Sequence, residues 1–300
     1  MNIDLTTEFK SKGYCLIENG LSVELLKRWQ TLAEKLEKDA VEKYQQGSQL
    51  HGVTIVQDKC GPRLMRYNDI FSADSQLVLD TLACPAMLIL SKELCGIGSV
   101  PLQMDIVFKQ QHPHPVVNWH QDAQHSRKYP YLNVGIYLDD AASGDGCLRY
   151  VPGTQYELQD IRGLSENYGW EVPGVVEQPA KAGDILVQDI MILHGSQPKR
   201  SEGVRRTIYV ELRPWQGILE SQKQSEQWSN LRRQWMSLVL LHDSESIWPE
   251  EWKNEYPEPA EREALFRTIL ENREAPEPSV WATFPVDRKD YPIPEDMLHW

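Results

Sequence analysis

Hydrophobic positions in the first third of the chain mostly follow helical spacing. From about Ser22 to Gln46 apolar residues recur every three or four positions, and Ser22 can cap a helix there, which predicts one long amphipathic helix. A strand is predicted before it at residues 13–21, and a pair of helices after it at residues 74–96. Residues 51–70 are mixed and fit strands or a loop. We expect residues 1–99 to form a helical support for the rest of the chain.

From residue 100 the pattern changes to short runs of β-branched and aromatic residues separated by turn residues. In residues 133–138 apolar side chains alternate with polar or small ones, as in a strand with one buried face. The run at residues 184–196 reads as one apolar strand that ends near His194. A series of such strands is typical of a β-sandwich or a jelly-roll barrel, so residues 100–214 are expected to form a mainly β core with the helices covering one face.

Residues 215–300 return to a helical and more polar pattern. Tryptophans recur through this segment, and prolines with acidic residues separate its short helical runs. We expect a helical C-terminal extension wrapped on the barrel, whose aromatic residues serve as packing anchors, as a lid or as a homodimer interface. Since no repeat or clear boundary divides the chain, residues 1–300 are expected to form a single domain.

Charge and composition exclude several classes of function. The chain of 300 residues has a formal net charge of -13 at pH 7 and a pI near 5.1, so it lacks the basic surface that nucleic-acid binding requires. It has no apolar segment of membrane-spanning length and no signal-peptide pattern, which predicts a cytoplasmic protein without membrane contact. Five cysteines without a C-x-x-C pair argue against disulfides and against a structural zinc site.

The segment VVNWHQDAQH, residues 116–125, contains the first candidate chemistry. Side chains two positions apart on a strand share a face, so His120 and Asp122 can reach one point while Gln121 points away. This geometry suits two ligands of one metal ion. For an isolated H-x-D motif, however, an ordinary histidine beside a turn aspartate is the more common explanation.

A second feature changes this assessment. His194 ends an apolar run, and Arg205 follows eleven residues later at the start of another β-like run. Two histidines and one carboxylate can form a facial triad that leaves one side of Fe(II) open for a 2-oxo acid and for oxygen. Because an arginine fork is the natural partner of a remote carboxylate, Arg205 is the candidate to bind such a co-substrate, and Arg206 should face the other way.

These motifs, with His194-Gly195-Ser196 and two further segments, resemble the phytanoyl-CoA dioxygenase family of Fe(II)- and 2-oxoglutarate-dependent oxygenases. The further segments are GDGCLRYVPGTQ and AGDILVQD. The resemblance implies a double-stranded β-helix, which is a cupin-like jelly roll, with Fe(II) as cofactor and with 2-oxoglutarate and O2 as co-substrates. It also implies the residues that bind them: His120, Asp122 and His194 for iron, and Arg205 for 2-oxoglutarate.

The resemblance extends to further positions. Ser196 matches a position whose hydroxyl helps to bind the 2-oxoglutarate carboxylate, and Gln103 resembles a glutamine that contacts the co-substrate. A polar group satisfied by the backbone is an equally good explanation for each. Lys199 and Gln155 depart from the family pattern, which commonly has asparagine and histidine there. These departures leave the metal ligands intact and affect the identity of the substrate.

Four more residues are candidates for a substrate pocket, and each has an ordinary alternative. Tyr137 fits the core equally well, and His125 fits a solvent-facing loop somewhat better. His112 and His114, flanked by prolines, are expected to be exposed. The four pocket candidates are Asn133, Tyr137, His125 and Arg149.

The resemblance implies an oxygenase that hydroxylates an unactivated carbon of a small-molecule metabolite and releases succinate and CO2. Asp122 disfavours halogenation, because the halogenases of this superfamily lack the carboxylate there. Desaturation, cyclisation and epimerisation use the same ligands and stay open, as does the substrate. Two alternatives come from other classes: a catalytically silent jelly-roll binding protein, and a zinc hydrolase with the same three ligands, which would not need Arg205.

Overall fold

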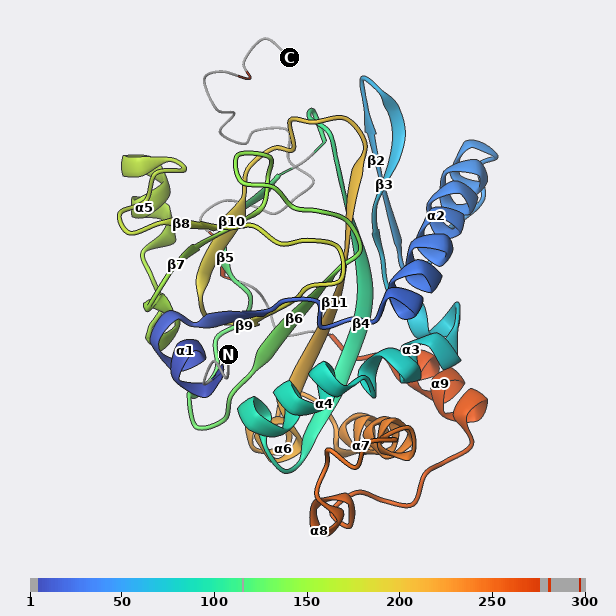
Figure 1. Cartoon of the computed structure of the whole chain (residues 1–300). Coiled ribbons are helices and arrows are strands. Elements are labelled where there is room, and N and C mark those ends of the chain that lie inside the picture. Colours follow the sequence, from blue (N-terminus) through green and yellow to red (C-terminus); the bar gives the residue numbers. More distant parts are fainter. Residues whose placement is uncertain (1–4, 115, 276–279, 282–296, 298–300) are drawn as a thin grey trace.

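The computed structural model describes residues 5–114, 116–275, 280–281 and 297. Two antiparallel sheets face each other and form a jelly roll (Figure 1). The major sheet has the order β1-β9-β6-β11-β4-β3-β2 and the minor sheet the order β12-β5-β10-β7-β8. The strands of the major sheet are β1 (Tyr14–Ile17), β2 (Val53–Asp58), β3 (Gly61–Tyr67), β4 (Ser99–Gln110), β6 (Leu132–Tyr137), β9 (Ile185–Asp189) and β11 (Val204–Pro214). Those of the minor sheet are β5 (Val117–Gln121), β7 (Leu148–Val151), β8 (Val176–Gln178), β10 (Leu193–Ser196) and β12 (Val280–Trp281).

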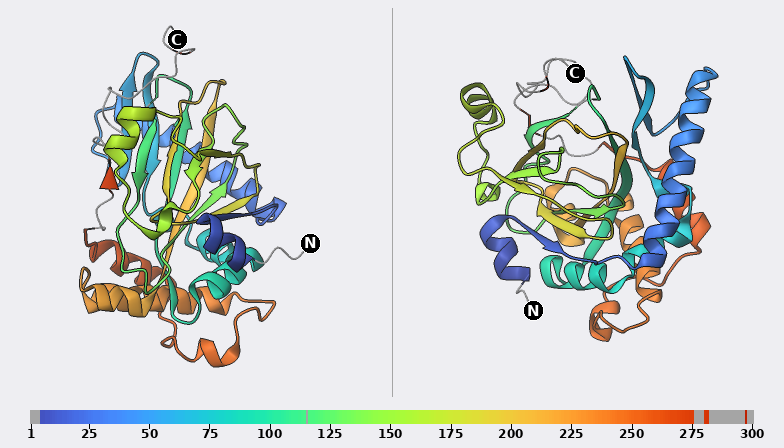
Figure 2. Two further views of the ribbon diagram at one scale, coloured as in Figure 1. Left: turned by 90° about the vertical axis from the view of Figure 1, so that its left-hand side faces the viewer. Right: turned by 45° about the horizontal axis from the view of Figure 1, so that its top comes forward.

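Helices cover the outer face of the major sheet (Figure 2). The longest is α2, where Ser22 caps the helix as predicted and its hydroxyl accepts a hydrogen bond from Leu25 N–H at 3.2 Å. One apolar core joins Trp29 of α2 and Trp235 of α7 to the outer side chains of the strands. The helices are α1 (Leu5–Lys12), α2 (Val23–Gln45), α3 (Ser75–Leu82), α4 (Pro85–Leu90), α5 (Ile161–Tyr168), α6 (Trp215–Ser221), α7 (Glu226–Leu241), α8 (Glu250–Lys253) and α9 (Arg262–Glu271), with short turns η1 (Ile70–Ser72), η2 (Ser91–Cys95) and η3 (Thr154–Tyr156).

The predicted pattern of elements is largely confirmed, with one instructive error. The run at residues 184–196 is not one strand, because it crosses from β9 in the major sheet to β10 in the minor sheet. The crossing is a turn in which the Asp189 carboxylate accepts the Met191 N–H at 2.9 Å and the Asp189 carbonyl accepts the Ile192 N–H at 3.0 Å. His194 is thereby carried to the sheet opposite β9.

The described part of the C-terminal extension is mainly helical. Helices α6 to α9 lie on the outer side of the major sheet, where Arg232 of α7 donates to the Leu102 carbonyl of β4 at 3.2 Å. Trp235 and Trp248 are buried there as packing anchors. Trp300 lies outside the described residues. Among those that are described, no helix is long and apolar enough to cross a membrane.

Candidate metal and co-substrate site

Three predicted ligands come together between β5 and β10. His120 and His194 are direct partners in the ladder of the minor sheet, and their ring centroids lie 4.0 Å apart. Asp122 follows β5, and its Oδ1 atom lies 3.1 Å from His120 Nε2 and 3.8 Å from His194 Nε2. One potential ligand atom from each residue lies within 4.8 Å of the other two. The three side chains therefore enclose a point that can hold a metal ion.

The backbone fixes the histidine rings in the form that a metal needs. His120 Nδ1 lies 2.8 Å from the Asn118 carbonyl, and His194 Nδ1 lies 2.9 Å from the Ile192 carbonyl. A carbonyl only accepts hydrogen bonds, so each Nδ1 carries the proton. Each Nε2 then directs its lone pair toward the shared point, as metal-ligating histidines do.

The Asp122 carboxylate is oriented by two amides. Its Oδ2 atom accepts hydrogen bonds from Asn133 Nδ2 at 3.0 Å and from Gln188 Nε2 at 3.2 Å, which leaves Oδ1 facing the histidines. The Tyr150 hydroxyl donates to Gln188 Oε1 at 2.5 Å and so directs the amide nitrogen of Gln188 inward. Asn133 was predicted as a substrate residue, whereas the structure places it against a metal-ligand candidate. Gln188 was missed, although a glutamine in the apolar run of β9 is a visible signal.

The charge states of the site also suit a cation. Burial works to raise the pKa of Asp122, but the positive charge that His194 carries when it is protonated, and the polar contacts of the carboxylate with His120 and Asn133, outweigh it and hold that pKa below its usual range. Burial, and next the charge of His120, lowers the pKa of His194 to about 4. Near neutral pH the site therefore offers an ionised carboxylate and a neutral His194, which are the forms that bind metal ions. Asp122 is the most open of the three, with 24% of its side chain exposed against 5% for each histidine.

Arg205 and Arg206 point to opposite sides of β11, as predicted. Arg205 is buried in the barrel interior, where its Nη1 donates to the Gly146 carbonyl. The Ser196 hydroxyl donates to the same carbonyl at 2.8 Å. Arg206 instead pairs with Asp139 on the outer side, with N–O distances of 2.7 and 2.8 Å. Of the two arginines, Arg205 is therefore the one placed to serve a ligand inside the barrel, beside Ser196.

Unpaired polar atoms beside Arg205 test whether a co-substrate fits. Within the part of the chain that the structure describes, Arg205 Nε, the Tyr137 hydroxyl and Thr207 Oγ1 are buried without a hydrogen-bond partner. Thr207 and Tyr137 are ladder partners, and Thr207 lies two residues from Arg205 on the same face of β11. Buried donors of this kind are rarely left unsatisfied. The carboxylate and oxo oxygens of 2-oxoglutarate are acceptors, so the interior fits this molecule.

Two other predicted site residues lie elsewhere, the pocket candidate Arg149 and the co-substrate candidate Gln103. Arg149 is beside Gly195 in the ladder, on the outer face that Trp170 covers, and its guanidinium pairs with Glu171 at 3.1 Å. The Arg149 side chain points away from His194, because Tyr150, the next residue of β7, points into the barrel and adjacent residues of a strand face opposite sides. Gln103 is half-buried at a bulge of β4, between residues of the outer core.

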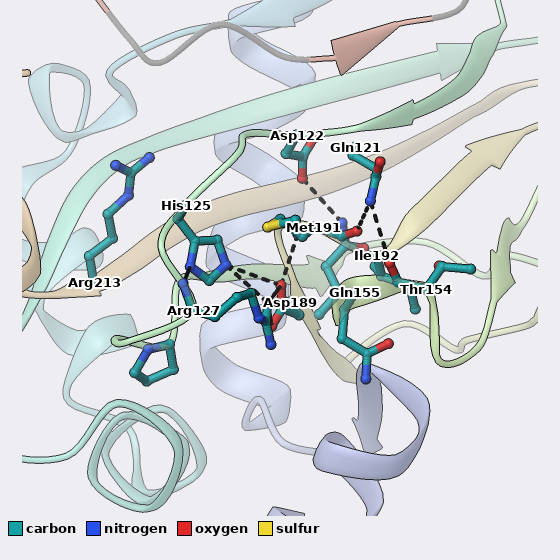
Figure 3. A network of polar contacts seen from close by, with 12 residues as sticks. Gln121, Asp122, His125, Arg127, Thr154, Gln155, Asp189, Met191, Ile192 and Arg213 are labelled. Carbon is teal, nitrogen blue, oxygen red and sulfur yellow. Dashed lines mark hydrogen bonds and ion pairs between the residues drawn. The ribbon is translucent and has the colours of Figure 1, made fainter. Parts of the chain in front are cut away.

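His125 is not a solvent-facing loop residue. Only 3% of its side chain is exposed, its ring stacks on Tyr131 at 4.7 Å, and its Nε2 lies 3.5 Å from Asp189 Oδ1. Arg127 donates to both carboxylate oxygens of Asp189, at 3.0 and 2.8 Å, and closes this network (Figure 3). Figure 3 also shows Gln121 directed away from Asp122, toward Met191 and Thr154. The network holds the loop that follows Asp122.

Four further residues were discussed with the motif, and two of them, Lys199 and Gln155, hold local structure. His112 and His114, expected to be exposed, are both buried. The Lys199 ammonium donates to the carbonyls of Ser201 and Glu202 and so closes its own loop. Gln155 donates to the Lys10 carbonyl at 3.1 Å, which ties α1 to the barrel.

Comparison with known proteins agrees with this geometry. A family model described as Phytanoyl-CoA dioxygenase (PhyH) matches residues 9–207. No curated protein matches the chain. Among similar solved structures, EvdMO1 has 24% identity and a TM-score of 0.58 over 69% of this chain and 49% of that one. AviO1 from Streptomyces viridochromogenes Tue57 has 25% identity and a TM-score of 0.57 over 71% of this chain and 96% of that one. EctD from S. alaskensis, solved with 2-oxoglutarate and 5-hydroxyectoine, is also similar, with 17% identity and a TM-score of 0.56 over 72% of this chain and 77% of that one. The likenesses to EvdMO1 and EctD show the fold alone, and this chain spans about half of the length of EvdMO1.

Proposed function

Because the chain belongs to the phytanoyl-CoA dioxygenase family of Fe(II)- and 2-oxoglutarate-dependent oxygenases, we propose that it hydroxylates a small-molecule metabolite. The observation that carries the proposal is the convergence of His120, Asp122 and His194 on one point in a barrel that also buries Arg205. In this proposal the first three residues hold Fe(II). Arg205 and Ser196 hold the far carboxylate of 2-oxoglutarate, and O2 is the second co-substrate.

Each protein group has a defined task in such a reaction. When bound, iron activates oxygen while 2-oxoglutarate is converted to succinate and CO2, and a C–H bond of the substrate is oxidised. Asn133 and Gln188 keep the Asp122 carboxylate turned toward the histidines. Tyr137 and Thr207 offer donors to the co-substrate. The side of the site near Asp122 is the more open one, so we place substrate entry there.

The surroundings of Asp122 favour a small metabolite over a polyanionic coenzyme A thioester. Three cations line the loop after Asp122 and the end of β11, and each is already paired with a carboxylate. The pairs are Arg127 with Asp189 at 2.8 Å, Lys128 with Glu220 at 2.6 Å, and Arg213 with Glu211 at 2.5 Å. Among the residues that the structure describes, these three pairs therefore add no excess of positive charge that could bind several phosphates. The bound 5-hydroxyectoine of EctD is likewise a small molecule.

A screen of metabolites for substrate-stimulated succinate release tests the proposal, with mass analysis of the product. Addition of one oxygen supports a hydroxylase, whereas loss of two hydrogens indicates a desaturase or cyclase of the same chemistry. Asp122→Ala should remove Fe(II) binding and turnover while the protein stays folded, and unchanged turnover would contradict the ligand assignment. Ligand binding without any succinate would favour the silent binding protein.

A further inference from the structure

An arginine with unused hydrogen-bond donors faces the barrel interior from β3. Arg66 is the ladder partner of Val107 on β4, and Val107 is in turn the partner of Thr207, whose side chain lies on the inner face of β11. Residues that lie opposite each other in a sheet point to the same side, so Arg66 also points inward. Because 41% of its side chain is exposed, Arg66 is open to a ligand that enters the barrel.

Asp105 fixes one nitrogen of the Arg66 guanidinium and leaves the other two free. Arg66 Nη2 donates to Asp105 Oδ2, while Asp105 Oδ1 accepts the Asp69 N–H at 2.9 Å, so the buried carboxylate is held in place. Arg66 Nε is buried without a hydrogen-bond partner, and no residue that the structure describes accepts from Nη1. A guanidinium has five N–H donors, so Arg66 can bind a second oxyanion while it keeps its contact with Asp105.

A tyrosine hydroxyl without a partner lies in the same part of the interior. Tyr209 is the ladder partner of Gly135 on β6, and a Cβ at Gly135 would lie 3.3 Å from Tyr209 Cε1, so the ring lies over the bare backbone of β6. Burial raises the pKa of its hydroxyl, on which the charges of Arg205, Asp122 and Arg66 also act. Within the described parts of the chain, no group forms a hydrogen bond with this hydroxyl. It therefore offers a donor in the region that these three charges share.

The position along β11 places this region beside the metal. The inward side chains of β11 are, in order, Arg205, Thr207, Tyr209 and Glu211. Arg205 marks the proposed co-substrate end, and Glu211 is the ladder partner of Asn133, which orients a metal-ligand candidate. Tyr209 thus lies between the co-substrate end and the level of the metal, on the wall that a substrate must contact to reach the metal.

We propose that Arg66 and Tyr209 form an oxyanion subsite for the substrate, which is therefore a small molecule with one carboxylate. This inference rests on the proposed function and names the substrate class of that site. The free nitrogens of Arg66 and the Tyr209 hydroxyl are donors, and buried donors are rarely left unsatisfied, so the substrate carboxylate supplies the missing acceptors. An arginine that already serves Asp105 suits one further negative charge and not several phosphates. Arg66 is thus a residue that determines substrate specificity without binding the metal.

The test compares two probes of similar shape that differ in charge, cyclohexanecarboxylate and cyclohexanecarboxamide. Both are titrated calorimetrically, without oxygen, into protein saturated with Fe(II) and 2-oxoglutarate. We expect the wild type to bind the carboxylate about 10- to 100-fold more tightly than the amide, the equivalent of one charged hydrogen bond. Arg66→Met should lose this preference because it weakens carboxylate binding alone. Arg66→Lys should keep part of the preference, and Tyr209→Phe should reduce it.

Arg63→Met is a matched control from the same strand. All three nitrogens of Arg63 already donate, two to Asp58 and one to the Gln111 carbonyl, so the preference for the carboxylate should stay as in the wild type. Equal affinity of the wild type for both probes, binding of neither probe, or a preference that survives in Arg66→Met would overturn the subsite. If Arg66→Met does not fold, a wild-type preference in both Arg66→Lys and Tyr209→Phe would overturn it.

The affinity for 2-oxoglutarate separates this subsite from the co-substrate site. Titrated alone into the Fe(II)-loaded protein, 2-oxoglutarate should bind Arg66→Met as tightly as the wild type. A loss of 2-oxoglutarate affinity as large as the loss of carboxylate affinity would assign Arg66 to the co-substrate and overturn the inference. A wild type that does not bind 2-oxoglutarate would instead refute the proposed function.

Discussion

Replacing Asn133 by alanine tests whether neutral amides fix the metal-binding orientation of Asp122. Asn133 Nδ2 and Gln188 Nε2 lie 3.0 and 3.2 Å from the same carboxylate oxygen. A hydrogen bond to a charged group contributes about 1.5 to 3 kcal/mol, and about 1.4 kcal/mol is tenfold in an equilibrium constant. Since Gln188 remains in Asn133→Ala, we expect the lower part of this range, a loss of about 10- to 30-fold in Fe(II) affinity.

The assay is an anaerobic Fe(II) titration against a chelator of known affinity, with 2-oxoglutarate omitted. The double variant Asn133→Ala/Gln188→Ala leaves the carboxylate free to rotate and should lose about 100-fold. Gln30→Ala is a matched control, because the Gln30 amide donates to the Leu138 carbonyl at 2.8 Å, just beyond the end of β6 and away from the metal. It should lose about 1 kcal/mol of stability and no Fe(II) affinity. Wild-type affinity in Asn133→Ala, or an equal loss in the control, would refute the reasoning.

Three further predictions follow from burial and pairing. Arg205→Ala should weaken 2-oxoglutarate binding by about 2 to 5 kcal/mol with little loss of stability. Arg206→Ala should instead lose about 1.5 to 3 kcal/mol of stability and keep its affinity for 2-oxoglutarate. Identical behaviour of the two variants in binding and melting experiments would contradict the strand register. Gly146→Ala should be destabilised by about 1 to 2 kcal/mol, because Gly146 has a left-handed backbone with a φ of +76°. It should also bind 2-oxoglutarate more weakly, because the Gly146 carbonyl holds Arg205 and a Cβ there would lie 2.7 Å from Cε of the buried Lys109. Calorimetry that finds neither change would exclude this close approach. Thiol titration at pH 8 should detect only Cys60 in the native protein and five thiols after denaturation, and a deficit of two in the denatured protein would indicate a disulfide. The four protected thiols are those for which burial raises the pKa: Cys15 and Cys95 to about 12, Cys84 and Cys147 to about 11.

The metal ligands could be predicted from the sequence because their pairing depends on positions that are close together in the chain. Two residues on one strand, two positions apart, share a face whatever the rest of the fold does, so His120 and Asp122 could be paired from the sequence. The same alternation separates Arg205 from Arg206. The long α2 helix and its Ser22 cap were equally visible, since both depend on neighbours within a few residues.

Partners that arrive from other strands were not predictable. Lys109 meets Arg205 through the register of β4 on β11, and a bulge shifts that register near Val210, which no local pattern reveals. Gln188 of the major sheet reaches Asp122, at the end of a strand of the minor sheet, only because the two sheets face each other. The direction of Arg149 was hidden for a different reason. All four residues of its strand are buried, so no alternation of polar and apolar positions marks its inner face.

A strand near the start of the chain and a strand near its end each form one edge of a sheet. β1 forms one edge of the major sheet, and β12 pairs with β5, the strand that carries His120. During synthesis, β5 therefore leaves the ribosome long before residues 280–281 exist to cover its outer edge. An open strand edge is a template for pairing with another chain. Chains that stop short of residue 280 should consequently aggregate through the strand of His120, even though they contain every proposed metal ligand.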